Sequence, residues 1–87
     1  MGNVERKGDP ATCGHVTTGS MNVFVNGRGA ARVGKDVAGG VILGPGVPTV
    51  LVNGFPISLR GDAVAGHGQN EHAGPTMTVG SNNVLAG

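Results

Sequence analysis

The chain has 87 residues, 18 of them glycine, no Trp or Tyr, and a formal net charge of +1. This length predicts one domain over residues 1–87, without a linker or an effector extension, and the balanced charge excludes a basic nucleic-acid-binding surface. No apolar run approaches the roughly 18 residues that span a membrane, and the charged start is unlike a signal peptide. A single cysteine excludes an internal disulfide, so a metal or a partner is left to support so small a core.

The first predicted element is a short extended segment near the N-terminus. It follows the sequence Arg6-Lys7-Gly8-Asp9 and carries Cys13 and His15, which are two residues apart. In an extended strand, side chains at that spacing point to one face. The segment therefore offers a thiol and an imidazole side by side.

An internal repeat follows. Residues 22–27 read Asn-Val-Phe-Val-Asn-Gly, residues 49–54 read Thr-Val-Leu-Val-Asn-Gly, and residues 83–87 read Asn-Val-Leu-Ala-Gly, a shortened third copy. Each full copy is followed by an arginine and then by a glycine-aspartate ending, with Lys35 inserted in one of them. The opening Arg6-Lys7-Gly8-Asp9 supplies the same ending for the third copy, which indicates two full units and one divided between the termini.

Each unit predicts a strand, a tight Asn-Gly turn, a second strand and a turn that ends in aspartate. Asn-Gly is the strongest two-residue hairpin signal, because both turn positions need positive φ. Gly or Pro interrupts every long helical window. We therefore expect an all-β fold with little or no helix, arranged as three similar units with pseudo-threefold symmetry; a generic β-meander is the plainer alternative. The aspartates Asp9, Asp36 and Asp62 are expected to accept hydrogen bonds from turn amides.

The ligand set of a zinc site is present once. Cys13, His15, His67 and His72 are the only Cys and His residues in the chain. Mixed thiolate and imidazole ligands suit zinc, and four of them fill a closed tetrahedral site that leaves no position for substrate. The sequence therefore predicts one structural Zn²⁺, with iron as the other metal to consider. The alternative is a free buried thiol with scattered surface histidines.

Nearly the whole chain carries a combination of short motifs that belong together. The motifs are Gly8-Asp9, Cys13-Gly14-His15, Gly19-Ser20, Val23-Phe24-Val25-Asn26-Gly27, Gly29-Ala30-Ala31-Arg32, Gly61-Asp62, His67, His72 and Gly80-Ser81. In this combination the chain resembles the PAAR-repeat proteins, the spike-tip proteins of contractile phage tails and type VI secretion systems. The name-giving Pro-Ala-Ala-Arg reads Gly29-Ala30-Ala31-Arg32 here.

The resemblance implies a structural, membrane-piercing tip and not an enzyme. Members form a cone whose base caps the blunt end of a trimeric β-helical spike, one chain per trimer, with a metal near the apex. By resemblance, Cys13, His15, His67 and His72 hold that metal. The expected location is the tip of a virion tail, or the cytoplasm before export by type VI secretion, with transient contact with a target envelope and no stable membrane insertion.

The three valine-rich segments are candidates for contact with the spike. Strand addition and apolar contact by Val23, Val25, Val50, Val52, Val84 and Ala86 would cover its exposed strand edges. The alternative is that these side chains form the core. Strand alternation predicts that Val23 and Val25 share a face and that Phe24 takes the other.

Two other functions stay open at this point. One is a free-standing zinc-binding adaptor or binding module, which would bind a small ligand and have no affinity for a trimeric spike. The other is a small zinc hydrolase, which the absence of an open coordination position in a four-ligand site disfavours.

Overall fold

The computed structural model describes residues 2–87, and in that range it is all-β, with one short 3₁₀ helix and no α-helix. The elements are β1 (Gly2–Asn3), β2 (Phe24–Val25), β3 (Arg28–Gly29), β4 (Val37–Ala38), β5 (Gly40–Gly44), β6 (Val47–Val52), β7 (Phe55–Ile57), β8 (Ala63–Val64), η1 (Asn70–His72) and β9 (Leu85–Ala86). All pairings are antiparallel: β1 with β9, β2 with β3, β6 with β7, and β5 between β4 and β8. The all-β prediction is confirmed.

Both predicted Asn-Gly hairpins are present. Asn26 and Gly27 connect β2 to β3 with φ of 53° and 77°. Asn53 and Gly54 connect β6 to β7 with φ of 54° and 87°. Positive φ at both central residues is the signature of the type I′ turn, whose twist matches that of the strands it joins.

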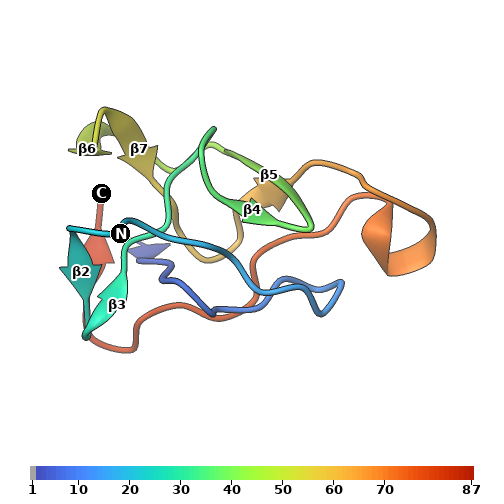
Figure 1. Ribbon diagram of the computed structural model, residues 1–87, viewed down its shortest axis with the longest axis horizontal. Coiled ribbons are helices and arrows are strands. Elements are labelled where there is room, and N and C mark those ends of the chain that lie inside the picture. Colours follow the sequence, from blue (N-terminus) through green and yellow to red (C-terminus); the bar gives the residue numbers. More distant parts are fainter. Residues whose placement is uncertain (1) are drawn as a thin grey trace.

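The two ends of the chain form the third copy of this pairing. In β2–β3, Phe24 lies opposite Gly29. In β1–β9, Leu85 lies opposite Asn3 in the same register. The third unit is therefore assembled from residues near the two termini, as the repeat predicts. All three pairs lie at one end of the molecule, together with the N- and C-termini (Figure 1).

A closed ring of backbone hydrogen bonds relates the three units. The amide of Glu5 donates to the carbonyl of Ser58, that of Ser58 to Ala31, and that of Ala31 back to Glu5, at 2.9 to 3.0 Å. Each unit thus gives and receives one bond at the same position, which defines a pseudo-threefold axis. All three residues are fully buried, so the ring lies inside the molecule.

The buried apolar residues form two separate clusters. The residues just before the ring, Val4, Ala30 and Ile57, belong to a base core. Ala31 of the ring belongs to an apical core. The apical core also holds Ala11, Cys13, Ala38, Ile42, Val64 and Met77. The hydrophobic interior is therefore divided into two small layers, and the apical layer reaches Cys13.

The three aspartates close equivalent turns, as predicted. Asp9 accepts from the Arg6 amide at 2.9 Å, Asp36 from the Arg32 amide at 2.8 Å, and Asp62 from the Leu59 amide at 2.8 Å. All three are at most 4% exposed. A buried carboxylate needs such partners to offset its lost hydration.

In two of the units, the arginine that opens this turn also pairs with the aspartate through its side chain. Arg6 Nε lies 3.0 Å from Asp9 and Arg32 Nε lies 2.8 Å from Asp36. These hydrogen bonds raise the pKa of both arginines above its ordinary value. In the unit that holds Asp62, Leu59 occupies the arginine position, so this unit has no such ion pair.

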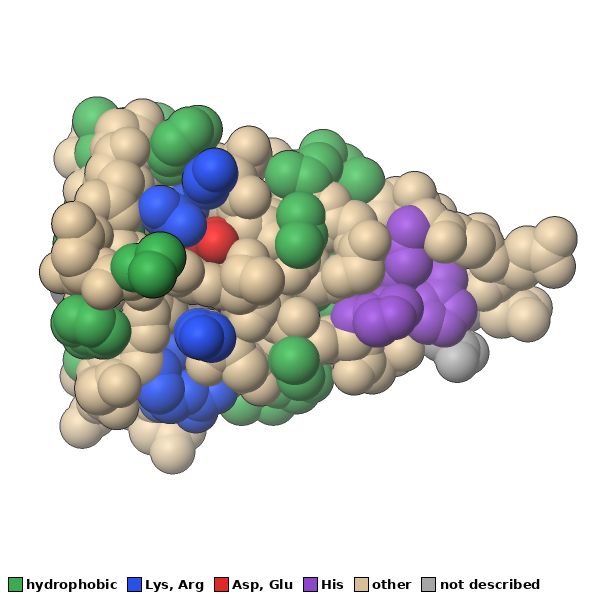
Figure 2. Space-filling view, viewed as in Figure 1, with side chains coloured by type: hydrophobic (Ala, Val, Ile, Leu, Met, Phe, Trp, Pro, Cys, Tyr) green, Lys and Arg blue, Asp and Glu red, His purple; other side chains and the backbone are tan. Residues whose placement is uncertain are grey.

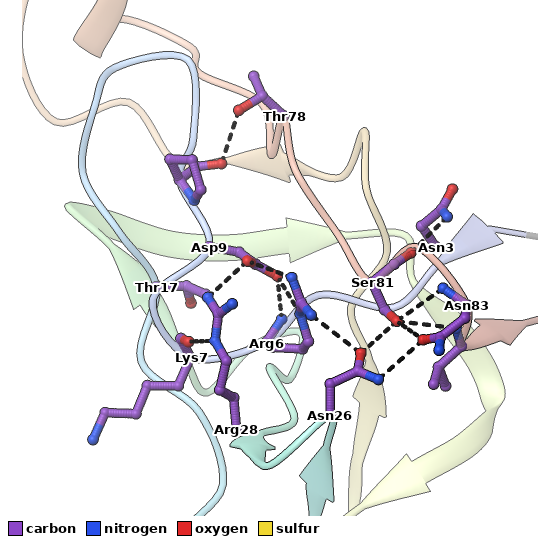
Figure 3. Close-up of polar contacts among 12 residues, drawn as sticks. Asn3, Arg6, Lys7, Asp9, Thr17, Asn26, Arg28, Thr78, Ser81 and Asn83 are labelled. Carbon is purple, nitrogen blue, oxygen red and sulfur yellow. Dashed lines mark hydrogen bonds and ion pairs between the residues drawn. The ribbon is translucent and has the colours of Figure 1, made fainter.

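Each arginine then links its turn to an Asn-Gly hairpin. Arg6 Nη1 and the Ser81 hydroxyl both donate to Asn26 Oδ1 (Figure 3). Asn26 Nδ2 donates in turn to Asn83 Oδ1. Equivalent contacts with other residues surround Asn53. They involve Arg32, Ser20 and Asn22. The side chain of each hairpin asparagine, and not only its φ, is therefore part of the fold.

The molecule tapers from the hairpin end to the opposite end. Its extents are 32 × 24 × 22 Å, and the three histidines cluster towards the narrow end (Figure 2). The segment that carries η1 lies at this end (Figure 1). Within residues 2–87 there is no helix with the length and apolar character needed to span a bilayer.

Candidate metal centre

The structure brings all four predicted ligands together. Cys13 Sγ lies 3.4 Å from His15 Nδ1, which lies 3.0 Å from His67 Nε2, which in turn lies 3.1 Å from His72 Nδ1. All four atoms lie within 4.8 Å of one another. Tetrahedral bonds of zinc length place neighbouring ligand atoms about 3.3 to 3.7 Å apart. The four residues could hold one metal ion.

A turn, and not a strand, places the first two ligands. The Gly14 amide donates to the Ala11 carbonyl at 3.0 Å, and the Ala11 amide donates to the His15 carbonyl at 2.9 Å. Gly14 has a φ of 87°. The expectation of an extended Cys13–His15 segment is therefore wrong. The thiol and the imidazole converge because the backbone folds back between them.

The other two ligands lie at the ends of one loop. The His67 amide donates to the His72 carbonyl at 2.8 Å. The loop between them contains η1, which ends at His72. His67 Nδ1 lies 3.0 Å from the carbonyl oxygen of Ala65. Since a carbonyl only accepts, Nδ1 carries the hydrogen there, and Nε2 is left as the ligand atom. Such an outer partner fixes both the tautomer and the orientation of a metal-binding histidine.

Gly39, in the turn between β4 and β5, makes room for the cluster. A Cβ added to it would lie well inside 3.0 Å of both His15 Nδ1 and His67 Nε2. Its φ of 83° also disfavours any other residue. No local signal in the sequence marks Gly39, because it is far in the chain from all four ligand residues. Gly39 is adjacent only in space.

The four side chains span the interior and the surface of the narrow end. Four protein ligands complete a tetrahedral shell, which is the arrangement of structural sites. Cys13 is 9% exposed and belongs to the apical core, whereas His15 is exposed. The cluster therefore joins the apical core to a surface loop, and an ion bound there would hold the two together.

Metal removal is expected to open the narrow end and to spare the axial ring. The backbone hydrogen bonds of the 67–73 loop join residues of the loop itself, whereas the three ring residues are fully buried. After treatment with a chelator, the His67 and His72 amides should exchange with deuterium much faster, while the Glu5, Ala31 and Ser58 amides stay protected. Hydrogen exchange followed by NMR measures this, and equal loss of protection at both places would contradict it.

Acid should have the same effect as the chelator. Metal binding needs a thiolate and neutral imidazoles, so protons compete with the ion for its ligands. The apparent metal affinity should therefore fall as the pH is lowered.

The residues predicted to contact a partner divide between the interior and the surface. Val25 and Val52 are 8% and 4% exposed and belong to the base core. Val84 and Ala86 pack against that core, and Val23 and Val50 are each 38% exposed. Val25 and Val52 therefore face the interior of this chain, and their contact with a partner stays a prediction.

The residues that alternate with the buried valines face outwards instead. Phe24 and Leu51 are each 60% exposed, and Leu85 is 48% exposed. These three, the outward triad, occupy the same position in the three units, next to Val25, Val52 and Ala86. Strand alternation predicted the orientation of Phe24 relative to Val25, but not that the outward residues would be the larger apolar ones.

No protein-family model, curated protein or solved structure matches this chain. The site is therefore interpreted from its own residues.

Proposed function

We propose that this protein is a structural tip that caps the blunt end of a trimeric β-helical spike in a contractile injection system. The observation that carries the proposal is the outward triad. Phe24, Leu51 and Leu85 expose apolar side chains at equivalent positions around one pseudo-threefold axis. A single asymmetric chain can satisfy three identical subunits only if it presents near-identical contacts in this way.

The taper supports the same function. The hairpins that carry the outward triad lie at the broad end, and the histidine cluster lies towards the narrow end (Figure 2). An object that is driven through an envelope has to be narrow in front and resist unfolding there. A narrow end has no room for a hydrophobic core, so a metal ion held by four ligands is a suitable stabiliser.

Zinc is the ion we propose for this position. One thiolate and three imidazoles are borderline-soft ligands in the number that zinc prefers, and its closed shell needs no redox partner. The apparent free energy of structural zinc binding, roughly 10 to 16 kcal/mol in small zinc-binding peptides, is large for so small a domain. The ion would thus act on stability and not on a substrate.

The docking test uses the trimeric spike protein encoded nearest to this chain's gene. We expect a complex of one chain with three spike subunits, measured by native mass spectrometry. Replacing Phe24, Leu51 and Leu85 together by serine should abolish the complex, because most of the apolar contact area is lost. The zinc content of the triple variant should equal that of the parent.

Leu43→Ser is the matched control. Leu43 is 58% exposed, almost as much as Leu51, but it lies in β5, outside the strand pairs β1–β9, β2–β3 and β6–β7. Its replacement should leave the complex intact. A triple variant that binds the spike as tightly as the parent would refute the proposed docking surface, and binding of a small ligand without any affinity for the spike would favour an adaptor.

A further inference from the structure

One acidic side chain has no role in the contacts described so far. Glu5 is 0% exposed, and neither oxygen of its carboxyl group has a hydrogen-bond partner among the described residues. It belongs to the axial ring, where the other two units have Ala31 and Ser58. The chain therefore places a carboxyl group at a position that its own repeat fills with a methyl or a hydroxymethyl group.

The neighbouring charges do not compensate this carboxyl group. The acids that act on it are Asp9 and Asp62, and the bases are Arg6 and Arg60. Arg6 is already paired with Asp9. Asp62 is already occupied by three neutral donors, the Ser58 hydroxyl and the amides of Leu59 and Gly46. Each aspartate acts more strongly on Glu5 than either arginine does, so these neighbours together disfavour a negative charge on it.

Burial acts in the same direction. Transfer of an unpaired carboxylate out of water is so costly that the group usually takes up a proton instead. Burial, followed by repulsion from Asp9 and Asp62, raises the pKa of Glu5 from 4.5 to about 8. The carboxyl group is therefore protonated in the folded chain at neutral pH.

We propose that Glu5 is a built-in proton switch: the protonated side chain is buried at the axial ring, and its ionisation loosens the fold where the three units meet. The position explains why one group has so large an effect. Each ring residue holds the two other units through its amide and its carbonyl. A charge that seeks water at this place strains all three connections at once.

The direction of the pH dependence follows from linkage. Between pH 4.5 and about 8, the folded chain keeps the Glu5 proton and the unfolded chain loses it. Stability from this group is therefore complete below pH 4.5, falls as the pH rises, and is lost above the folded-state pKa. From pH 5.5 to 7.5 the folding equilibrium constant should fall by roughly a hundredfold through Glu5 alone.

The repeat itself supplies the variants for the test. Glu5→Ala copies Ala31 and Glu5→Ser copies Ser58, whereas Glu5→Gln keeps the size and removes the charge. The full zinc-loaded chain and its variants are unfolded with urea from pH 5.5 to 7.5 in excess zinc. Because metal loading changes with pH equally in all of them, the ratio of the folding equilibrium constants of parent and variant isolates the effect of Glu5.

We expect that ratio to fall by roughly a hundredfold over this range for each neutral variant. Parallel curves for the parent and Glu5→Ala would overturn the proposal. A second measurement needs no variant: the side-chain carboxyl carbon of Glu5 in the parent, followed by NMR, should titrate near pH 8. Titration near the ordinary value of 4.5 would overturn the proposal even if every variant failed to fold.

Discussion

Replacing Gly39 by alanine is expected to abolish metal binding while the broad end stays folded. The new methyl group would occupy the space between His15 Nδ1 and His67 Nε2, two of the four ligand atoms. Because the conflict involves both rings, moving one side chain does not relieve it. We expect zinc content, measured by plasma mass spectrometry, to fall from about one per chain to near zero. The ring amides should remain protected from exchange.

Gly61→Ala is the control for backbone strain. Gly61 has a φ of 93°, comparable to the 83° of Gly39, but a Cβ at Gly61 would meet nothing within 4 Å. Both variants carry the cost of an alanine in the left-handed region, about 1 to 2 kcal/mol. Only Gly39→Ala crowds the ligands. Equal zinc content in the two variants would show that the space next to Gly39 is not needed by the metal.

Replacing Asp36 by asparagine is expected to lower the free energy of unfolding by about 3 kcal/mol. Asp36 is 2% exposed and accepts from the side chain and the amide of Arg32 and from the hydroxyl of Thr18. Removing the charge leaves a guanidinium group that is largely buried and has lost its carboxylate partner. Urea denaturation of the zinc-loaded chain measures the change.

The turn from Leu59 to Asp62 provides two controls for this prediction. Arg32→Leu copies Leu59, and it leaves the Asp36 carboxylate with its amide and hydroxyl donors. Asp62→Asn removes a carboxylate that has only neutral donors, so no cation is left unpaired. Both should cost less than Asp36→Asn, about 1 to 2 kcal/mol each. An Asp36→Asn variant no less stable than these two would show that the ion pair adds little to the fold.

The backbone ring relates the three units although their side chains differ. The Asn-Gly turns are repeated in two units, and the third copy of the pairing forms between residues near the two termini without such a turn. In the unit of residues 46–62, Leu59 replaces an arginine and Val47 follows Gly46 where the others have Gly-Ser. One of the three connections between units is therefore mainly apolar, while the other two rely on arginine, asparagine and serine.

The sequence by itself determined the features that depend on neighbouring residues. Asn26-Gly27 and Asn53-Gly54 specify their turns, because positive φ is a property of these residues wherever they occur. The aspartate turns follow for the same reason. The four ligands could be identified because the chain contains no other Cys or His. The repeat then implied three equivalent units.

The tertiary structure decided everything that depends on contact between distant segments. Cys13–His15 forms a turn and not a strand, and Gly39 lies next to His15 and His67. Val25 faces the interior and Phe24 faces outwards. Burial is a property of the packed chain: the same Val-x-Val segment can face a partner or a core, and only the arrangement of the other units distinguishes the two. Glu5 shows this most clearly, since nothing in Val4-Glu5-Arg6 indicates that its carboxyl group is fully buried without a hydrogen-bond partner.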